Sequence, residues 1–95
     1  MIAISENPDK KRFEALVEGK TAFVDYIRAK DAVYLTHTEV PTGLEGRGVG
    51  SNLVKGVLEL LEEEGVRIAP LCPFVAAYIK RHPEWKRVLA PNYNV

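Results

Sequence analysis

Three segments in the first half of the chain carry β-branched and aromatic residues and are bounded by polar ones. They predict strands at 13–18, 21–28 and 32–40. Glu18-Gly19-Lys20 fits a hairpin turn between the first two strands, and Lys30-Asp31 is a second short polar connection. We therefore expect an antiparallel meander of three strands.

The apolar spacing changes to a helical one after residue 50. One face of a predicted helix over 51–64 carries Leu53, Val54, Val57, Leu58 and Leu61, and Gly65 ends this helix. The short apolar run 66–69 suits a buried fourth strand.

Proline residues mark the remaining elements. Pro73 fits the first turn of a second helix over 74–81, because a proline there loses no helical hydrogen bond. His82-Pro83 stops that helix, and residues 84–89 predict a final short helix. Residues 5–12 are polar and charged and predict at most a short lead-in. The result is an α+β domain over 1–95, with the order βββαβα around one mixed sheet.

Composition narrows the classes of function. Thirteen basic residues balance thirteen acidic ones, so there is no electrostatic attraction to nucleic acid or to a membrane surface. The single cysteine, Cys72, excludes an internal disulfide and a multi-cysteine metal site. No apolar run is long enough to span a bilayer and no signal-peptide pattern is present. We expect a cytoplasmic protein without a metal, either a monomer or a weak homodimer.

A glycine-rich loop between the third strand and the first helix is the most informative feature. It reads Glu45-Gly46-Arg47-Gly48-Val49-Gly50-Ser51. The helix begins near Gly50 or Ser51, and the first N–H groups of a helix lack intrahelical partners and attract negative charge. Glycines allow a phosphate to approach the main chain. The alternative is a glycine-rich turn that binds no ligand.

Two familiar phosphate-binding motifs do not fit this loop. A P-loop closes with Gly-Lys-Ser/Thr, whereas this loop closes with Gly50-Ser51-Asn52. The dinucleotide fingerprint needs a third glycine that is absent here, and it lies in a parallel βαβ unit.

Three stretches of the sequence together resemble the GNAT superfamily of acyl-CoA-dependent N-acetyltransferases, in particular its very short single-domain branch. They are residues 35–41 (LTHTEVP), 45–50 (EGRGVG) and 71–79 (LCPFVAAYI), and the resemblance extends over roughly 12–88. The superfamily pattern Gln/Arg-x-x-Gly-x-Gly/Ala maps onto 45–50. Gly48 and Gly50 match it, and Glu45 departs from it.

The resemblance implies acetyl-CoA as cosubstrate and an amine as acceptor. Main-chain groups of Glu39 and Val40 would bind the pantetheine arm, and amides from Arg47 to Ser51 would bind the pyrophosphate. The expected CoA-binding residues are Val40, Glu45, Gly46, Arg47, Gly48, Val49, Gly50 and Ser51. Strand 66–69 and helix 74–81 would form the other wall of the site.

Four side chains are candidates for catalysis, and each has a structural alternative. Cys72 at a helix N-terminus is either a thiol beside the thioester or a small buried hydrophobe. His37 and Glu39 share one face of a strand with Leu35, either as a general base or as the solvated face of a sheet. In the superfamily a tyrosine at the position of Tyr78 protonates the departing CoA thiolate, but a packed core ring is the alternative.

Three functions follow from these observations. The first is acetyl transfer from acetyl-CoA directly to an amine of a small molecule or a protein. The second is a non-catalytic CoA- or nucleotide-binding module, and the third is an interaction domain that keeps only the fold. The sequence does not identify the acceptor.

Overall fold

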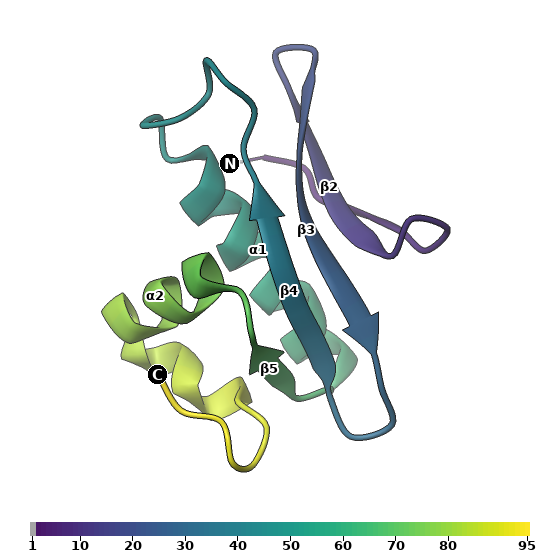
Figure 1. The fold of residues 1–95 in the computed structure, drawn as a ribbon, viewed down its shortest axis with the longest axis vertical. Helices are drawn as coiled ribbons and strands as arrows, with labels where there is room; N and C mark the ends of the chain where they lie inside the picture. The colour runs from purple at the N-terminus through teal and green to yellow at the C-terminus, as the bar shows by residue number, and fades with distance from the viewer. Residues whose placement is uncertain (1) are drawn as a thin grey trace.

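The computed structural model describes residues 2–95, which form five strands, two α-helices and one 3-10 helix. Their order along the chain is β1 (Ser5–Asn7), β2 (Arg12–Val17), β3 (Lys20–Arg28), β4 (Val33–Glu39), α1 (Val49–Glu64), β5 (Ile68–Pro70), α2 (Pro73–Arg81) and η1 (Pro83–Val88). The strands form one sheet in the order β1-β2-β3-β4-β5 (Figure 1). Neighbouring strands are antiparallel except β4 and β5, which are parallel.

This arrangement confirms the predicted α+β class with one mixed sheet. The turn between β2 and β3 has positive φ at both Glu18 (52°) and Gly19 (77°), as a two-residue turn between twisted strands requires. Gly65 ends α1 in the left-handed region, which a residue without a Cβ atom enters at no steric cost.

Three details differ from the sequence prediction. Residues 5–7 form an edge strand paired with β2 instead of an unpaired lead-in. Helix α1 begins at Val49, one to two residues earlier than expected. The last short helix is a 3-10 helix over Pro83–Val88.

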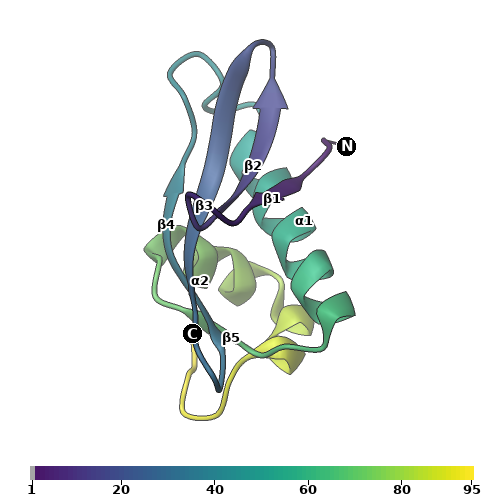
Figure 2. The same cartoon turned by 90° about the vertical axis from the view of Figure 1, so that its right-hand side faces the viewer.

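The larger of two hydrophobic clusters among the described residues lies between the sheet and the helices. Strands β2, β3 and β4 alternate buried and more exposed residues, and the buried ones face α1, which covers one side of the sheet (Figure 2). The five apolar residues predicted for α1 are all fully buried. Side chains of α2 and η1 join the same core, among them Val75, Ile79 and Trp85. All three helices therefore pack on one face, and the other face of β2 and β3 has no helix against it.

Two further features of the described residues concern membranes and metals. No helix within residues 2–95 combines the length and the apolar character that crossing a membrane requires. Within the same residues, no three His, Cys, Asp or Glu side chains gather as a metal site would need.

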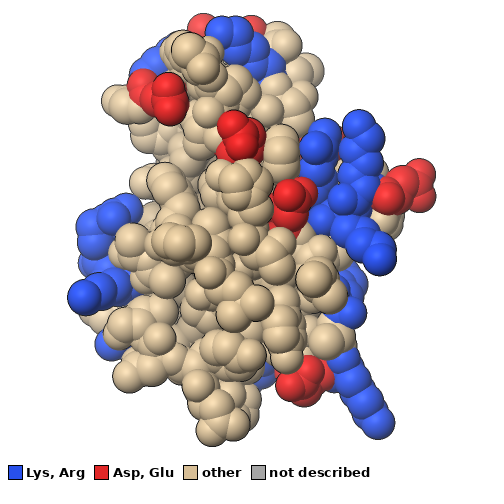
Figure 3. Space-filling model, in the orientation of Figure 1, with Lys and Arg blue, Asp and Glu red and all other residues tan. Residues whose placement is uncertain are grey.

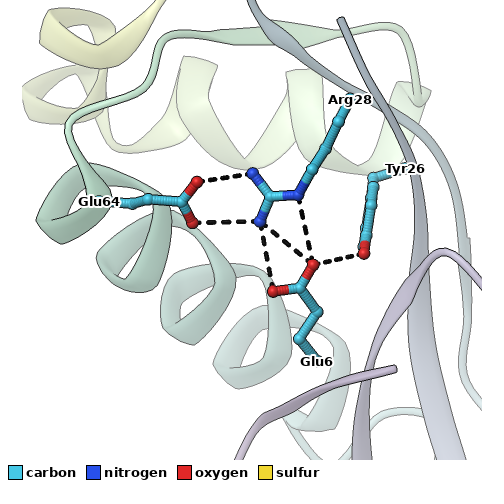
Figure 4. Close-up of polar contacts among 4 residues, drawn as sticks. All are labelled: Glu6, Tyr26, Arg28 and Glu64. Carbon is cyan, nitrogen blue, oxygen red and sulfur yellow. Dashed lines mark hydrogen bonds and ion pairs between the residues drawn. The ribbon is translucent and has the colours of Figure 1, made fainter. Parts of the chain in front are cut away.

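A polar cluster attaches β1 to the rest of the fold (Figure 4). Arg28 of β3 donates to both oxygens of Glu64 at the end of α1, at 2.6 and 3.1 Å, and to Glu6 of β1 at 3.1 Å. The buried Tyr26 hydroxyl also donates to Glu6. The hydrogen bond from Tyr26 lowers the pKa of Glu6, and Arg28 lowers it further. The cluster therefore holds the short edge strand to both the sheet and α1.

We expect Glu6→Gln to reduce the free energy of unfolding by about 1 kcal/mol at pH 7, because it weakens charge-assisted hydrogen bonds at a partly exposed carboxylate. A lowered folded-state pKa contributes stability above the ordinary glutamate value of about 4.3, and that contribution is lost as pH falls through the lowered pKa. Urea unfolding of the two proteins should therefore converge in acid. Glu63→Gln on the exposed side of α1 is the control, and an equal effect of both variants would contradict this role.

Candidate active site

A register shift in β4 determines which side chains face the interior. Asp25 of β3 pairs with His37, but the next residue, Tyr26, pairs with Leu35, so Thr36 is an extra residue in β4. Such a β-bulge reverses the alternation of the strand beyond it. Leu35 and Thr38 therefore both face the helices.

The same bulge corrects one prediction. His37 and Glu39 do share a face, with His37 Nε2 3.0 Å from Glu39 Oε1, but that face is opposite to the one of Leu35. Regular alternation would have placed all three together. His37 and Glu39 are exposed, at 57% and 53%, beside the ring of Phe23. They lie on the sheet face that no helix covers.

Strands β4 and β5 separate soon after they meet. Their parallel pairing covers only Val33 to Leu35, opposite Ile68 to Pro70. The Cys72 N–H donates to the Leu35 carbonyl at 2.8 Å, and the chain then turns into α2 at Pro73. Among the described strands, β4 beyond Leu35 has no partner on this side. An extended ligand could therefore use its free main-chain groups.

A groove of about 470 Å³ opens at the end of β4. It is bounded by the end of β4, the glycine-rich loop, the first turn of α1 and the first turn of α2. Its lining residues are Thr38, Glu39, Val40, Leu44, Glu45, Gly46, Gly48, Val49, Gly50, Ser51 and Phe74. All the predicted CoA-binding residues except Arg47 are among them.

The first turn of α1 presents free donors to this groove. Gly48 occupies the N-cap with φ 76° and provides no side-chain cap, and the first turn contains no acidic residue. The first helical hydrogen bond runs from the Asn52 N–H to the Gly48 carbonyl. By helix geometry the N–H groups of Val49, Gly50 and Ser51 have no intrahelical acceptor, so they are available to an anion.

Arg47 points elsewhere. Its guanidinium donates to Glu18 in the turn between β2 and β3, and this hydrogen bond raises the pKa of Arg47 and lowers that of Glu18. Both side chains are at least half exposed. Exposed ion pairs contribute little free energy, so Arg47 can exchange Glu18 for a phosphate at small cost.

The predicted catalytic side chains do not form one cluster. Only Glu39 borders the groove, at the end of β4, and its side chain lies with His37 on the opposite face of the sheet. Cys72 is 3% exposed, and its Sγ lies 3.3 Å from Oγ1 of Thr38, which itself lines the groove. Thr38 therefore stands between the thiol and the groove. His37 reaches the groove only through its contact with Glu39.

Tyr78 packs in the core. It is almost fully buried, and its ring lies 4.4 Å from that of His82, centroid to centroid. Burial raises its pKa, and the charges of Glu84 and Glu59 add to the rise. Its role in catalysis stays a prediction, as do those of Cys72, His37 and Glu39.

Three groove residues were not predicted from the sequence. Thr38 lines it because of the bulge, which no residue pattern in β4 indicates. Leu44 and Phe74 line it because a loop and a helix N-terminus converge there. Such convergence depends on tertiary packing. The one relevant signal in the sequence is a glycine at position 50, which leaves space for the Phe74 ring.

Comparisons with known proteins agree with this geometry. A family model described as GCN5-related N-acetyl-transferase matches residues 12–88. Protein NATD1 of Xenopus tropicalis is 27% identical over 86 residues, covering 86% of this chain and 78% of that protein. Protein NATD1 of Mus musculus is 28% identical over the same length, covering 86% and 77%.

A solved structure shares the fold. The solution NMR structure of a GCN5-like protein from Staphylococcus aureus superposes with a TM-score of 0.71 at 23% identity, covering 93% of this chain and 87% of that one. The family model covers most of the chain, from the start of β2 to the end of η1. The chain belongs to the GCN5-related N-acetyltransferase family.

Proposed function

We propose that this protein binds acetyl-CoA in the groove and transfers the acetyl group directly to an amine of a small molecule or of a protein. The observation that carries the proposal is the uncapped N-terminus of α1, which opens into a groove beside the unpaired end of β4. A phosphorylated ligand with an extended, amide-bearing arm matches both parts.

The residues around the groove fit the parts of CoA. The pyrophosphate would lie on the N–H groups of the first turn of α1, where Gly46 and Gly48 add no side chain to the groove. The pantetheine arm would follow β4 beside Val40. Glu45 adds a negative charge at the position where the family pattern has Gln or Arg, so affinity rests on backbone donors and the helix dipole.

When bound, acetyl-CoA supplies an acyl thioester as the acetyl donor. An acceptor amine is protonated at neutral pH and must lose a proton before it can react. We assign this proton to the His37–Glu39 pair, since Glu39 borders the groove and His37 contacts it. Direct transfer needs no enzyme nucleophile, so Cys72 serves only as a polar contact. Tyr78 is assigned the separate role of donating a proton to the departing CoA thiolate.

A CoA-binding module without catalysis is the second candidate. The specific observation in its favour is that three of the four predicted catalytic side chains do not line the groove. Both candidates predict CoA binding, and only the first predicts turnover with an amine. A thermal shift with CoA tests what they share, because ligand at about 100 times Kd adds ~2.7 kcal/mol of stability.

Ser51→Asp tests the phosphate site without disturbing the helix. A carboxylate in the first turn of α1 interacts favourably with the helix dipole and should stabilise the ligand-free protein by ~0.3–1 kcal/mol. The same charge repels phosphate, so the affinity for CoA should fall about tenfold or more. Ser51→Asn is the neutral control. Equal CoA affinity of both variants, measured by calorimetry, would refute the assignment.

Cys72 is expected to report on the pantetheine arm. It should react with iodoacetamide at pH 8 in the ligand-free protein, slowly because the thiol is buried, and CoA should slow the reaction further. Adenosine 3′-phosphate 5′-diphosphate keeps the phosphates of CoA but lacks the pantetheine arm, so it serves as the control ligand. A thiol that stays inert in the native state, or that CoA does not protect, is a structural cysteine.

The His37–Glu39 pair is tested by turnover once a screen of amines and peptides has found an acceptor. Removing a general base usually costs about 10²–10⁴-fold, so His37→Ala and Glu39→Gln should lower turnover and leave CoA affinity nearly intact. Full turnover by both variants would place the base elsewhere.

A further inference from the structure

The first turns of α1 and α2 meet at a single close contact. The ring of Phe74, the second residue of α2, rests on Gly50, the second residue of α1. A Cβ atom built on Gly50 would lie 2.6 Å from Cζ of Phe74, which is closer than real Cβ atoms approach, and 3.2 Å from Cε1. Gly50 is in a helix and has no positive φ, so it is not required by backbone conformation. Because Gly50 has no side chain, the Phe74 ring can occupy the space beside it.

Phe74 is not simply a core residue. Its side chain is 40% exposed, and it lines the groove together with the apolar side chains of Val40, Leu44 and Val49. Large aromatic side chains usually bury more of their surface, because each contributes a large apolar area. The exposed part of the ring therefore gives the groove an apolar wall beside the N–H donors of α1.

The groove thus combines two kinds of surface, the N–H donors of the first turn of α1 and an apolar wall. Phosphates need the donors of the first turn of α1 and gain nothing from an aromatic ring. The pantetheine arm of CoA carries a gem-dimethyl group and methylenes, which gain free energy when an apolar wall excludes water. We propose that the Phe74 ring, held in place by Gly50, contacts the pantetheine arm and determines that this groove accepts CoA in preference to an adenine nucleotide.

This inference rests on the proposed CoA site and names the residue that gives it specificity. Calorimetry with CoA and with adenosine 3′-phosphate 5′-diphosphate, which is CoA without its pantetheine arm, separates a failure of the proposed CoA site from a failure of the inference about Phe74. If neither ligand binds the unaltered protein, the proposed function and the inference both fail. If CoA binds, the variants described below test only whether Phe74 contacts the pantetheine arm.

Phe74→Ala should weaken CoA binding about tenfold and leave the affinity for adenosine 3′-phosphate 5′-diphosphate unchanged, since only CoA carries the arm. Phe74→Leu keeps an apolar side chain and should retain CoA affinity within about threefold. Leu71→Ala removes another exposed apolar side chain that lies outside the groove, and it is the matched control. An unchanged CoA affinity of Phe74→Ala, or an equal loss for both ligands, would overturn the proposal.

Gly50→Ala tests the same contact from the other side. Alanine favours a helix more than glycine does, so the variant should fold, but its methyl group displaces the ring. CoA affinity should fall as in Phe74→Ala. In a double-mutant cycle Gly50→Ala should then have no further effect when Phe74 is already alanine. Additive losses would show that Gly50 acts on the ligand directly and would overturn the role of the ring.

Discussion

The extra residue in β4 is the constraint on which the geometry of the site depends. Before Thr36 the strand pairs on both edges, and beyond it the strand pairs only with β3. Because the bulge reverses the alternation, one short strand presents Leu35 to the core, Thr38 to the groove and His37 to the opposite face. A regular strand could not bring Leu35 and Thr38, which are three residues apart, to one face. Bulges commonly re-aim side chains beside active sites in this way.

Proline residues complete the separation of β4 from β5. Pro70 ends β5 and has no N–H group with which to extend the ladder, and Pro73 begins α2 in the conformation that a helix requires. The turn between them places the first turn of α2 opposite that of α1. The groove therefore forms where β4 and β5 stop pairing, and the helices border it.

Much of the fold could be predicted from the sequence, because helical spacing, a two-residue turn and a terminal glycine act over short distances. The buried face of α1 and the Gly65 cap depend only on residues within the helix. Strand β1 was missed, since its polar residues pair through Glu6 with Arg28, far along the chain. The glycine-rich loop identified most of the groove. Thr38 and Phe74 were missed because a register shift and a helix–helix contact decide their positions.

The contact between Gly50 and Phe74 also constrains how this sequence can change over evolutionary time. The two positions are 24 apart in the sequence (74 − 50), yet the space at one is occupied by the other. A lineage that first gains a side chain at position 50 must pass through a protein in which the Phe74 ring is displaced from its place on α1. A lineage that first shortens position 74 does not. The order of two substitutions is therefore constrained although their final pair is not, and related chains should vary at these positions together.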